Sequence, residues 1–159
     1  MTRQSTKHSG DRTPPALRRL NRAMSLSTLT DLIQLNFSAG DCLIVLGYRP
    51  GQYIPSGKYA ETDITDWVRT VRRQLDSNLK YILATEQGRD GKTATVHRIV
   101  VRHPIEGASL LAAYWKYGPA KVEEVQAGQL SALAERLVPN TRTEPCKRAW
   151  TTSRNLQRT

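Results

Sequence analysis

The sequence has little of what metal-rich, disulfide-linked or membrane-spanning proteins need. Its 159 residues include two cysteines, three histidines and one phenylalanine, and no apolar run approaches the ~18 residues that cross a bilayer. Three histidines with cysteines that lack CxxC spacing are too few ligands for a zinc finger, and no GxxxxGK phosphate loop is present. Cys42 and Cys146 either pair or, as we prefer, stay reduced in a cytoplasm.

Positive charge is plentiful and is concentrated at the two ends of the chain. The sequence carries 24 Lys and Arg against 14 Asp and Glu, a net charge of +10. Residues 1–22 and 136–159 together hold twelve basic and two acidic residues, so residues 23–135 are neutral. A neutral body with basic ends is typical of a protein that binds a polyanion, most often nucleic acid. The alternative is solvated ends that only confer solubility.

Apolar periodicity predicts one domain of alternating helices and strands. Hairpin-linked strands among covering helices indicate an α+β class with a mainly antiparallel sheet. Residues 1–12 are expected to be a disordered basic arm, 13–139 the domain and 140–159 a basic C-terminal tail. The patterns predict helices at 15–35, 64–75, 106–115 and 130–139, and strands at 42–48, 80–86, 93–101 and 120–125.

A loop and a helix cap are predicted before the second helix. Residues 49–60 contain two prolines and two glycines, which favour a loop. Thr62 and Asp63 precede the apolar stripe that starts at Ile64, so they are the candidate capping residues.

Two strands joined by a predicted tight turn bring polar side chains together. Asp90-Gly91 is a strong signal for a two-residue hairpin turn. That turn puts Glu86 opposite Thr95 and makes His97 a diagonal neighbour of Glu86, so that all three share one face of the sheet. Arg98 then points to the opposite face. The local geometry therefore predicts a place where a carboxylate and an imidazole meet.

Five segments, taken in their order and spacing, carry a family resemblance. They are TPPALRRLNR at 13–22, LNF at 35–37 leading into DCLIVLGY at 41–48, YILATEQG at 81–88, WKYG at 115–118, and KRAWTTSRNL at 147–156. Together they resemble the rolling-circle replication initiators of phages, plasmids and other mobile elements. The nucleases of this family carry a histidine–hydrophobic–histidine (HUH) metal motif. The resemblance implies an HUH-endonuclease-like fold with a ferredoxin-like or RRM-like sheet.

The resemblance also implies a catalytic centre, which this sequence holds only in part. In such enzymes two histidines and an acidic residue hold a divalent cation at the scissile phosphate, and a tyrosine attacks that phosphate to form a 5′-phosphotyrosine. The implied acidic residue is Glu86 and the implied second histidine is His97. Thr95 stands at the first histidine position, and Arg136 stands at the tyrosine position.

Both substitutions argue against strand nicking. An arginine is protonated at any relevant pH and cannot attack a phosphate, although it can hold one. Tyr114 and Tyr117 are the last tyrosines, and both precede the final predicted strand. Glu86 and His97 form either a polar pair, which we prefer, or a weak Mg²⁺ or Mn²⁺ site completed by water. No cofactor is required.

The basic ends supply the predicted nucleic-acid interface. Basic residues interleaved with Trp150 suit phosphate contacts plus base stacking, while the alternative is that Trp150 packs back on the core. The residues predicted to contact nucleic acid are Arg18, Arg19, Arg22, Arg136, Lys147, Arg148, Trp150 and Arg154.

The sequence thus predicts a DNA-binding protein of mobile-element origin that resembles a replication initiator and has lost its nicking chemistry. We expect single-stranded or hairpin DNA as ligand, a cytoplasmic location in a bacterial host, and no membrane association. Two alternatives stay open. One is a residual metal-dependent single-strand nuclease that uses Glu86 and His97. The other is a phage-encoded interaction protein that binds a host protein and inhibits a nucleic-acid-handling or antiviral defence system.

Overall fold

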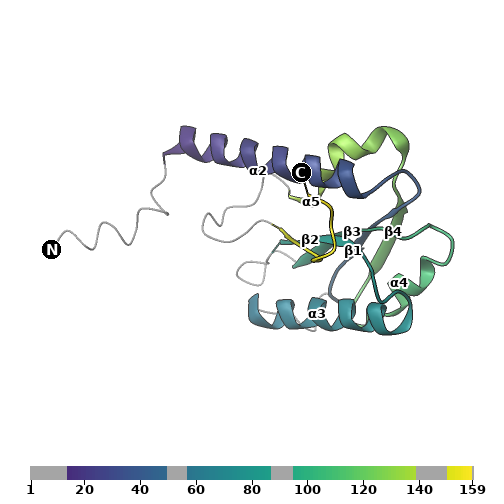
Figure 1. Ribbon diagram of the computed structural model, residues 1–159. Helices are drawn as coiled ribbons and strands as arrows, with labels where there is room; N and C mark the ends of the chain where they lie inside the picture. Colours follow the sequence, from purple (N-terminus) through teal and green to yellow (C-terminus); the bar gives the residue numbers. More distant parts are fainter. Residues whose placement is uncertain (1–13, 50–56, 87–94, 139–149, 159) are drawn as a thin grey trace.

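A five-stranded sheet in the order β4-β1-β3-β2-β5 carries the fold, and every neighbouring pair of strands is antiparallel (Figure 1). The computed structural model describes residues 14–49, 57–86, 95–138 and 150–158. Its strands are β1 (Cys42–Leu46), β2 (Tyr81–Glu86), β3 (Val96–Val101), β4 (Ala120–Glu124) and β5 (Thr151–Thr152). The predicted α+β class with an antiparallel sheet is confirmed.

Helices cover both faces of the sheet (Figure 1). One face packs against α3 (Gly57–Gln74) and α4 (Ser109–Ala113), and we call it the α3 face. The other, the α2 face, packs against α2 (Pro15–Asn36), the 3-10 turn η1 (Ala127–Ala132) and α5 (Leu133–Leu137). The helix predicted at 130–139 is therefore split between η1 and the shorter α5.

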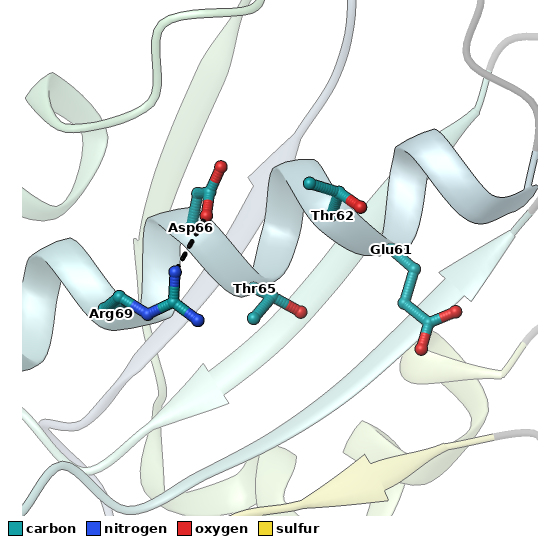
Figure 2. A pocket seen from close by; sticks show the side chains of 5 residues that line it. All are labelled: Glu61, Thr62, Thr65, Asp66 and Arg69. Atoms are coloured by element: carbon teal, nitrogen blue, oxygen red, sulfur yellow. Dashed lines mark hydrogen bonds and ion pairs between the residues drawn. The ribbon is translucent and has the colours of Figure 1, made fainter.

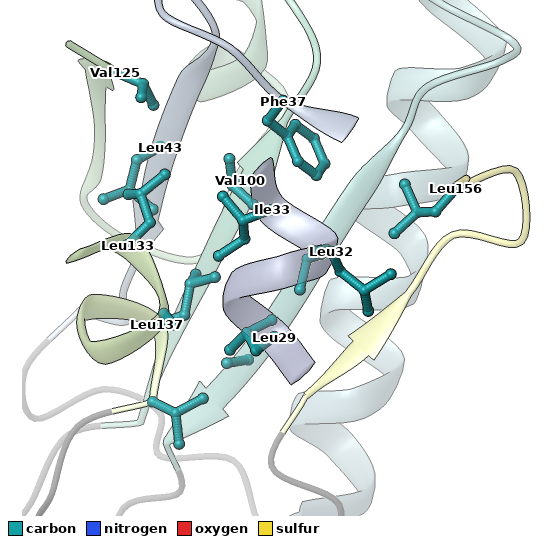
Figure 3. Close-up of a cluster of buried hydrophobic side chains, with 14 residues drawn as sticks. Leu29, Leu32, Ile33, Phe37, Leu43, Val100, Val125, Leu133, Leu137 and Leu156 are labelled. Carbon is teal, nitrogen blue, oxygen red and sulfur yellow. The ribbon is translucent and has the colours of Figure 1, made fainter. Parts of the chain in front are cut away.

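Alternation along the strands divides the apolar residues between two cores. In β3, Val100 joins the core of the α2 face, whereas Ile99 and Val101 join that of the α3 face. The α2-face core is drawn in Figure 3, where leucines of α2 and α5 pack together on this face of the sheet. Its labelled members are Leu29, Leu32, Ile33, Phe37, Leu43, Val100, Val125, Leu133, Leu137 and Leu156.

The second long helix, α3, begins earlier than its apolar stripe predicts. It starts at Gly57, so residues 57–60 are helical rather than loop, and Thr62 and Asp63 lie inside the helix rather than at its cap. Asp63 resembles a capping residue in the sequence because it is polar and precedes an apolar stripe. It is instead buried, and its carboxylate accepts a hydrogen bond from the Tyr48 hydroxyl at 3.1 Å. That buried partner is what permits a carboxylate on the inner side of the helix.

Part of the predicted basic tail belongs to the domain. Thr151 and Thr152 add β5 to the edge of the sheet beside β2. Next to β5, Ser153 is buried, and its backbone N–H donates to the Tyr81 carbonyl at 3.0 Å. Leu156 enters the α2-face core at 7% exposure. Residues 150–158 are therefore packed as part of the fold.

A reciprocal pair of hydrogen bonds holds the end of this segment against α2. The Asn36 side-chain amide donates to the Gln157 carbonyl at 2.9 Å. In return, the Gln157 backbone N–H donates to Asn36 Oδ1 at 2.6 Å. Both polar atoms of a buried asparagine are thereby satisfied by one backbone position.

Some predicted features lie outside the described residues. They are the arm at 1–12, the Asp90-Gly91 turn, and the basic and thiol side chains Lys147, Arg148 and Cys146. Within the described ranges, no helix combines the length and apolar character that crossing a bilayer requires.

Replacing Leu156 with alanine tests whether residues 150–158 form part of the core. Leu156→Ala removes a buried side chain and should lower the free energy of unfolding by about 2–4 kcal/mol, measured by urea denaturation. The exposed neighbour Arg154 is the control, since Arg154→Ala should change it by less than about 0.5 kcal/mol. A segment that is only a tail would give equal, small changes for both variants.

Candidate functional site

The register of β2 against β3 decides which polar side chains meet. Glu86 is paired with Val96, and Thr85 with His97. This register is one residue away from the predicted one, in which Glu86 opposes Thr95. Because a shift of one residue moves side chains to the other face, Glu86 lies on the α2 face and His97 on the α3 face. The prediction that Glu86, Thr95 and His97 share a face is wrong.

The length of the connection explains the error. Nine residues separate Glu86 from its partner Val96, which is an odd number. A ladder closed by a two-residue turn always separates paired residues by an even number. The Asp90-Gly91 signal therefore predicts a register that the paired strands do not have.

The partner of Glu86 is Arg98. The Arg98 guanidinium donates to Glu86 Oε1 at 2.9 Å, and both side chains are about three-quarters buried. This corrects the expectation that Arg98 points away from Glu86. On β3, the positions that share a face with Glu86 are Val96 and Arg98, and neither supplies a ligand for a metal ion. Among the described residues, those at Glu86 therefore do not fit a divalent cation, since a guanidinium already pairs with the carboxylate.

His97 belongs to a chain of hydrogen-bonded side chains on the α3 face. Its side chain is fully buried, with Nε2 2.9 Å from the Tyr48 hydroxyl and Nδ1 2.7 Å from Thr85 Oγ1. The single hydroxyl proton of Tyr48 is donated to Asp63. Nε2–H must therefore donate to Tyr48, and Nδ1 must accept from the Thr85 hydroxyl. Both ring nitrogens are occupied by protein groups.

Aromatic rings surround this chain and exclude water from it. The Trp115 ring meets the His97 ring edge to face, with centroids 5.5 Å apart, and contacts Tyr48 and Tyr117 at 5.4 and 4.9 Å. The Trp115 indole N–H donates to the Gly47 carbonyl at 2.7 Å. Burial in this surrounding lowers the pKa of His97 to about 4. The imidazole is thus neutral at physiological pH and has a packing role.

A close backbone contact supports the same cluster. A Cβ placed on Gly118 would lie 2.6 Å from the Tyr48 backbone, a distance that no side chain tolerates. Only glycine lets the two segments approach this closely. The glycine of the WKYG segment thus has a packing function beside Tyr48.

Arg136, at the position implied for the nucleophile, is engaged in an ion pair. It lies on α5, and its Nη2 donates to Glu123 Oε2 of β4 at 2.6 Å. The side chain is 42% exposed, so the guanidinium stays accessible at the rim of the α2 face. The position implied for the nucleophile thus carries a cationic side chain that cannot attack a phosphate.

The other residues predicted to contact nucleic acid are spread over the fold. Trp150 is half-buried against the α2-face core, and its indole N–H donates to Ser25 Oγ at 3.3 Å, which confirms the packing alternative. Arg154 is exposed beyond β5. Arg18, Arg19 and Arg22 belong to α2, where the structure describes their backbone.

A depression on the outer side of α3 does not form a binding cleft. Figure 2 shows its lining, which comes from this single helix and includes an ion pair between Arg69 and Asp66 at 3.3 Å. The lining residues are Glu61, Thr62, Thr65, Asp66 and Arg69. Because one helix supplies every wall, no groups converge on a ligand from different directions.

The thiol of Cys42 also has a packing role. Cys42 is a free, buried thiol that donates to the His103 carbonyl at 3.2 Å, and burial raises its pKa to about 11. In the described part of the chain, no three His, Cys, Asp or Glu side chains come together in a group that could hold a metal ion.

Comparison with protein-family models, curated proteins and solved structures found no match to this chain.

The polar chain around His97 yields a pH-dependent prediction. Because the ordinary histidine pKa is about 6.5, the unfolded chain takes up this proton at a higher pH than the folded one. The neutral His97 therefore makes its full contribution to the free energy of unfolding above about pH 6.5. This contribution, about 3 kcal/mol in total, is lost as the pH falls toward 4.

His97→Gln, which cannot titrate, is the matched variant for this prediction. Urea denaturation between pH 7 and 4 should show the stability of the wild type falling more steeply than that of the variant. Parallel curves for the two proteins would contradict a buried, neutral His97.

Proposed function

We propose that this chain is a DNA-binding domain that resembles a rolling-circle replication initiator and lacks strand-nicking chemistry. The observation that carries the proposal is the ion pair between Arg98 and Glu86 at 2.9 Å. This ion pair engages Glu86, the residue that the resemblance implies as the acidic metal ligand. His97, the implied second ligand, lies on the opposite face of the sheet.

The arrangement of elements supports the resemblance. Strand order β4-β1-β3-β2, with α3 between β1 and β2 and α4 between β3 and β4, is that of a ferredoxin-like sheet. After β4 the chain returns through α5 to the α2 face, the face on which Glu86 lies. The helix implied to carry the nucleophile thus covers the face that carries the implied acidic residue.

The charges near that face support binding in place of cleavage. Arg98 and Arg136 supply guanidinium groups where the resemblance implies a metal ion and a tyrosine. Guanidinium groups recognise phosphate through paired hydrogen bonds, and a phosphate oxygen can take the place of a carboxylate oxygen. An interface of this kind holds the DNA backbone without a group that attacks phosphorus.

The nuclease alternative loses its geometric basis. It requires Glu86 and His97 to act on one phosphate, but they lie on opposite faces of the sheet, and both His97 nitrogens are bonded within the protein. A metal ion bound at Glu86 would have to displace Arg98 and would find no second side-chain ligand on β3.

DNA binding can be measured directly. Fluorescence anisotropy with a labelled single-stranded oligonucleotide should show binding at low salt whose affinity falls steeply with salt, since phosphate contacts release counterions. A labelled hairpin serves as the second ligand. Absence of binding to either ligand at any salt concentration contradicts the proposal and favours the alternative of a protein partner.

The loss of chemistry has its own test. Incubation with single-stranded DNA and Mn²⁺ should give neither cleaved strands nor a covalent protein–DNA adduct on denaturing gels, for the wild type and for Glu86→Ala alike. Cleavage by the wild type that Glu86→Ala and His97→Ala both abolish would show that the nuclease survives.

A further inference from the structure

Three basic residues, Arg102, Lys80 and Arg154, flank β3, β2 and β5 at the same end of the sheet. The Arg102 backbone N–H donates to the Lys80 carbonyl at 3.0 Å, which continues the β2–β3 ladder by one position. On the other side, the Ser153 N–H donates to the Tyr81 carbonyl at 3.0 Å, which continues the ladder between β2 and β5. Arg154 follows Ser153 directly, in a turn at this end of the sheet.

Lys80 and Arg102 belong to the α2 face. Lys80 is two residues from Ile82, and Arg102 is two residues from Val100, both of which enter the α2-face core. Arg154 is exposed in the turn that follows β5. A fourth cation, Arg158, is held beside them because its guanidinium donates to Thr152 Oγ1 at 3.0 Å. We call Lys80, Arg102, Arg154 and Arg158 the basic row.

In the part of the chain that the structure describes, the members of the basic row stand outside the ion pairs. Among the described residues, ion pairs bind Arg69, Arg98 and Arg136, whereas no member of the basic row takes part in one. The nearest acid in the register is Asp41, which is buried, accepts the Ser38 N–H at 2.9 Å and also interacts electrostatically with Arg102. The unpaired charge of the row therefore rests mainly on Lys80, Arg154 and Arg158. Arg102 also donates to the Asn36 carbonyl at the end of α2, at 3.2 Å.

The backbone that carries the row is held rigidly. The Asn155 side chain donates to the Asn78 carbonyl at 2.9 Å, Leu156 is buried, and Gln157 is held by Asn36. Lys80 is half-buried while the other three side chains are exposed. Fixed backbone positions with exposed charged ends bind a ligand at a smaller entropic cost than a mobile tail does.

We infer that the basic row is a binding surface for the phosphate backbone of single-stranded DNA, an inference that rests on the proposed function. Neighbouring strands lie ~4.8 Å apart, so Arg102, Lys80 and Arg154 span about 10 Å, and their long side chains can follow successive phosphates. A lysine and three arginines among polar residues suit a polyanion.

A charge-removing triple variant tests this surface. Lys80→Gln/Arg154→Gln/Arg158→Gln removes three cations and keeps Arg102, which supports the end of α2. The control is Arg49→Gln/Arg69→Gln/Lys116→Gln, which removes the same charge from exposed residues elsewhere. Arg49 and Lys116 lie at the opposite end of the sheet, where the Arg49 N–H donates to the Tyr117 carbonyl.

The expected result follows from counterion release at single strands, about 0.7 counterions per phosphate contact. Loss of three contacts should reduce the slope of log affinity against log salt by about 2, and the affinity at 0.1 M salt by about 100-fold. The control should keep the wild-type slope. Arg154→Gln alone should reduce the slope by about 0.7, which covers the case in which the triple variant does not fold.

Two outcomes overturn the inference while leaving DNA binding intact. Equal losses in the triple variant and the control would show that only net charge matters. A larger loss in the control would place the interface at the opposite end of the sheet. A wild type that binds no DNA instead overturns the proposed function itself.

Discussion

The pairing of β2 with β3 is the constraint on which both faces of this domain depend. With Thr85 beside His97, the imidazole enters the apolar α3 face, where Tyr48 and Thr85 satisfy both of its nitrogens. The same pairing sends Glu86 and Arg98 to the α2 face, where they neutralise one another. A slip of one residue would move Arg98 toward the apolar core of the α3 face and would take His97 away from Tyr48 and Thr85, so burial on both faces holds the register in place.

His97 and Glu86, which resemble parts of a catalytic centre, therefore have separate explanations. Packing explains the histidine, and ion pairing explains the carboxylate. Leaving a buried donor or acceptor unsatisfied costs about 1–3 kcal/mol, and the chain from Thr85 through His97 and Tyr48 to Asp63 leaves none of its members in that state. On the other face, the guanidinium of Arg98 stands beside a carboxylate that a metal ion would otherwise need. On the same face, Arg98 and Arg136 are held in ion pairs, whereas no ion pair among the described residues includes a member of the basic row.

Much of the fold follows from local sequence patterns, and most of the site does not. The apolar periodicity of α2 and of the first four strands predicts their positions to within a few residues. The register of β2 against β3 depends on the length of the connection between them and on burial by elements that are distant in the sequence. The Asp90-Gly91 turn signal contains neither kind of information. Residues 151–152 are too few and too polar to indicate a strand, and the basic row exists only because β5 pairs with β2. Only Arg154 of that row is predicted, and Tyr48, Asp63 and Thr85 join His97 only through tertiary contacts.

Glu86 and His97 lie on opposite faces of the sheet, which separates the two implied metal ligands. Nuclear Overhauser effects between backbone protons of β2 and β3 test it most directly. We predict cross-strand effects that pair Glu86 with Val96 and Thr85 with His97. Effects that pair Glu86 with Thr95 instead would place Glu86 and His97 on one face and contradict the account.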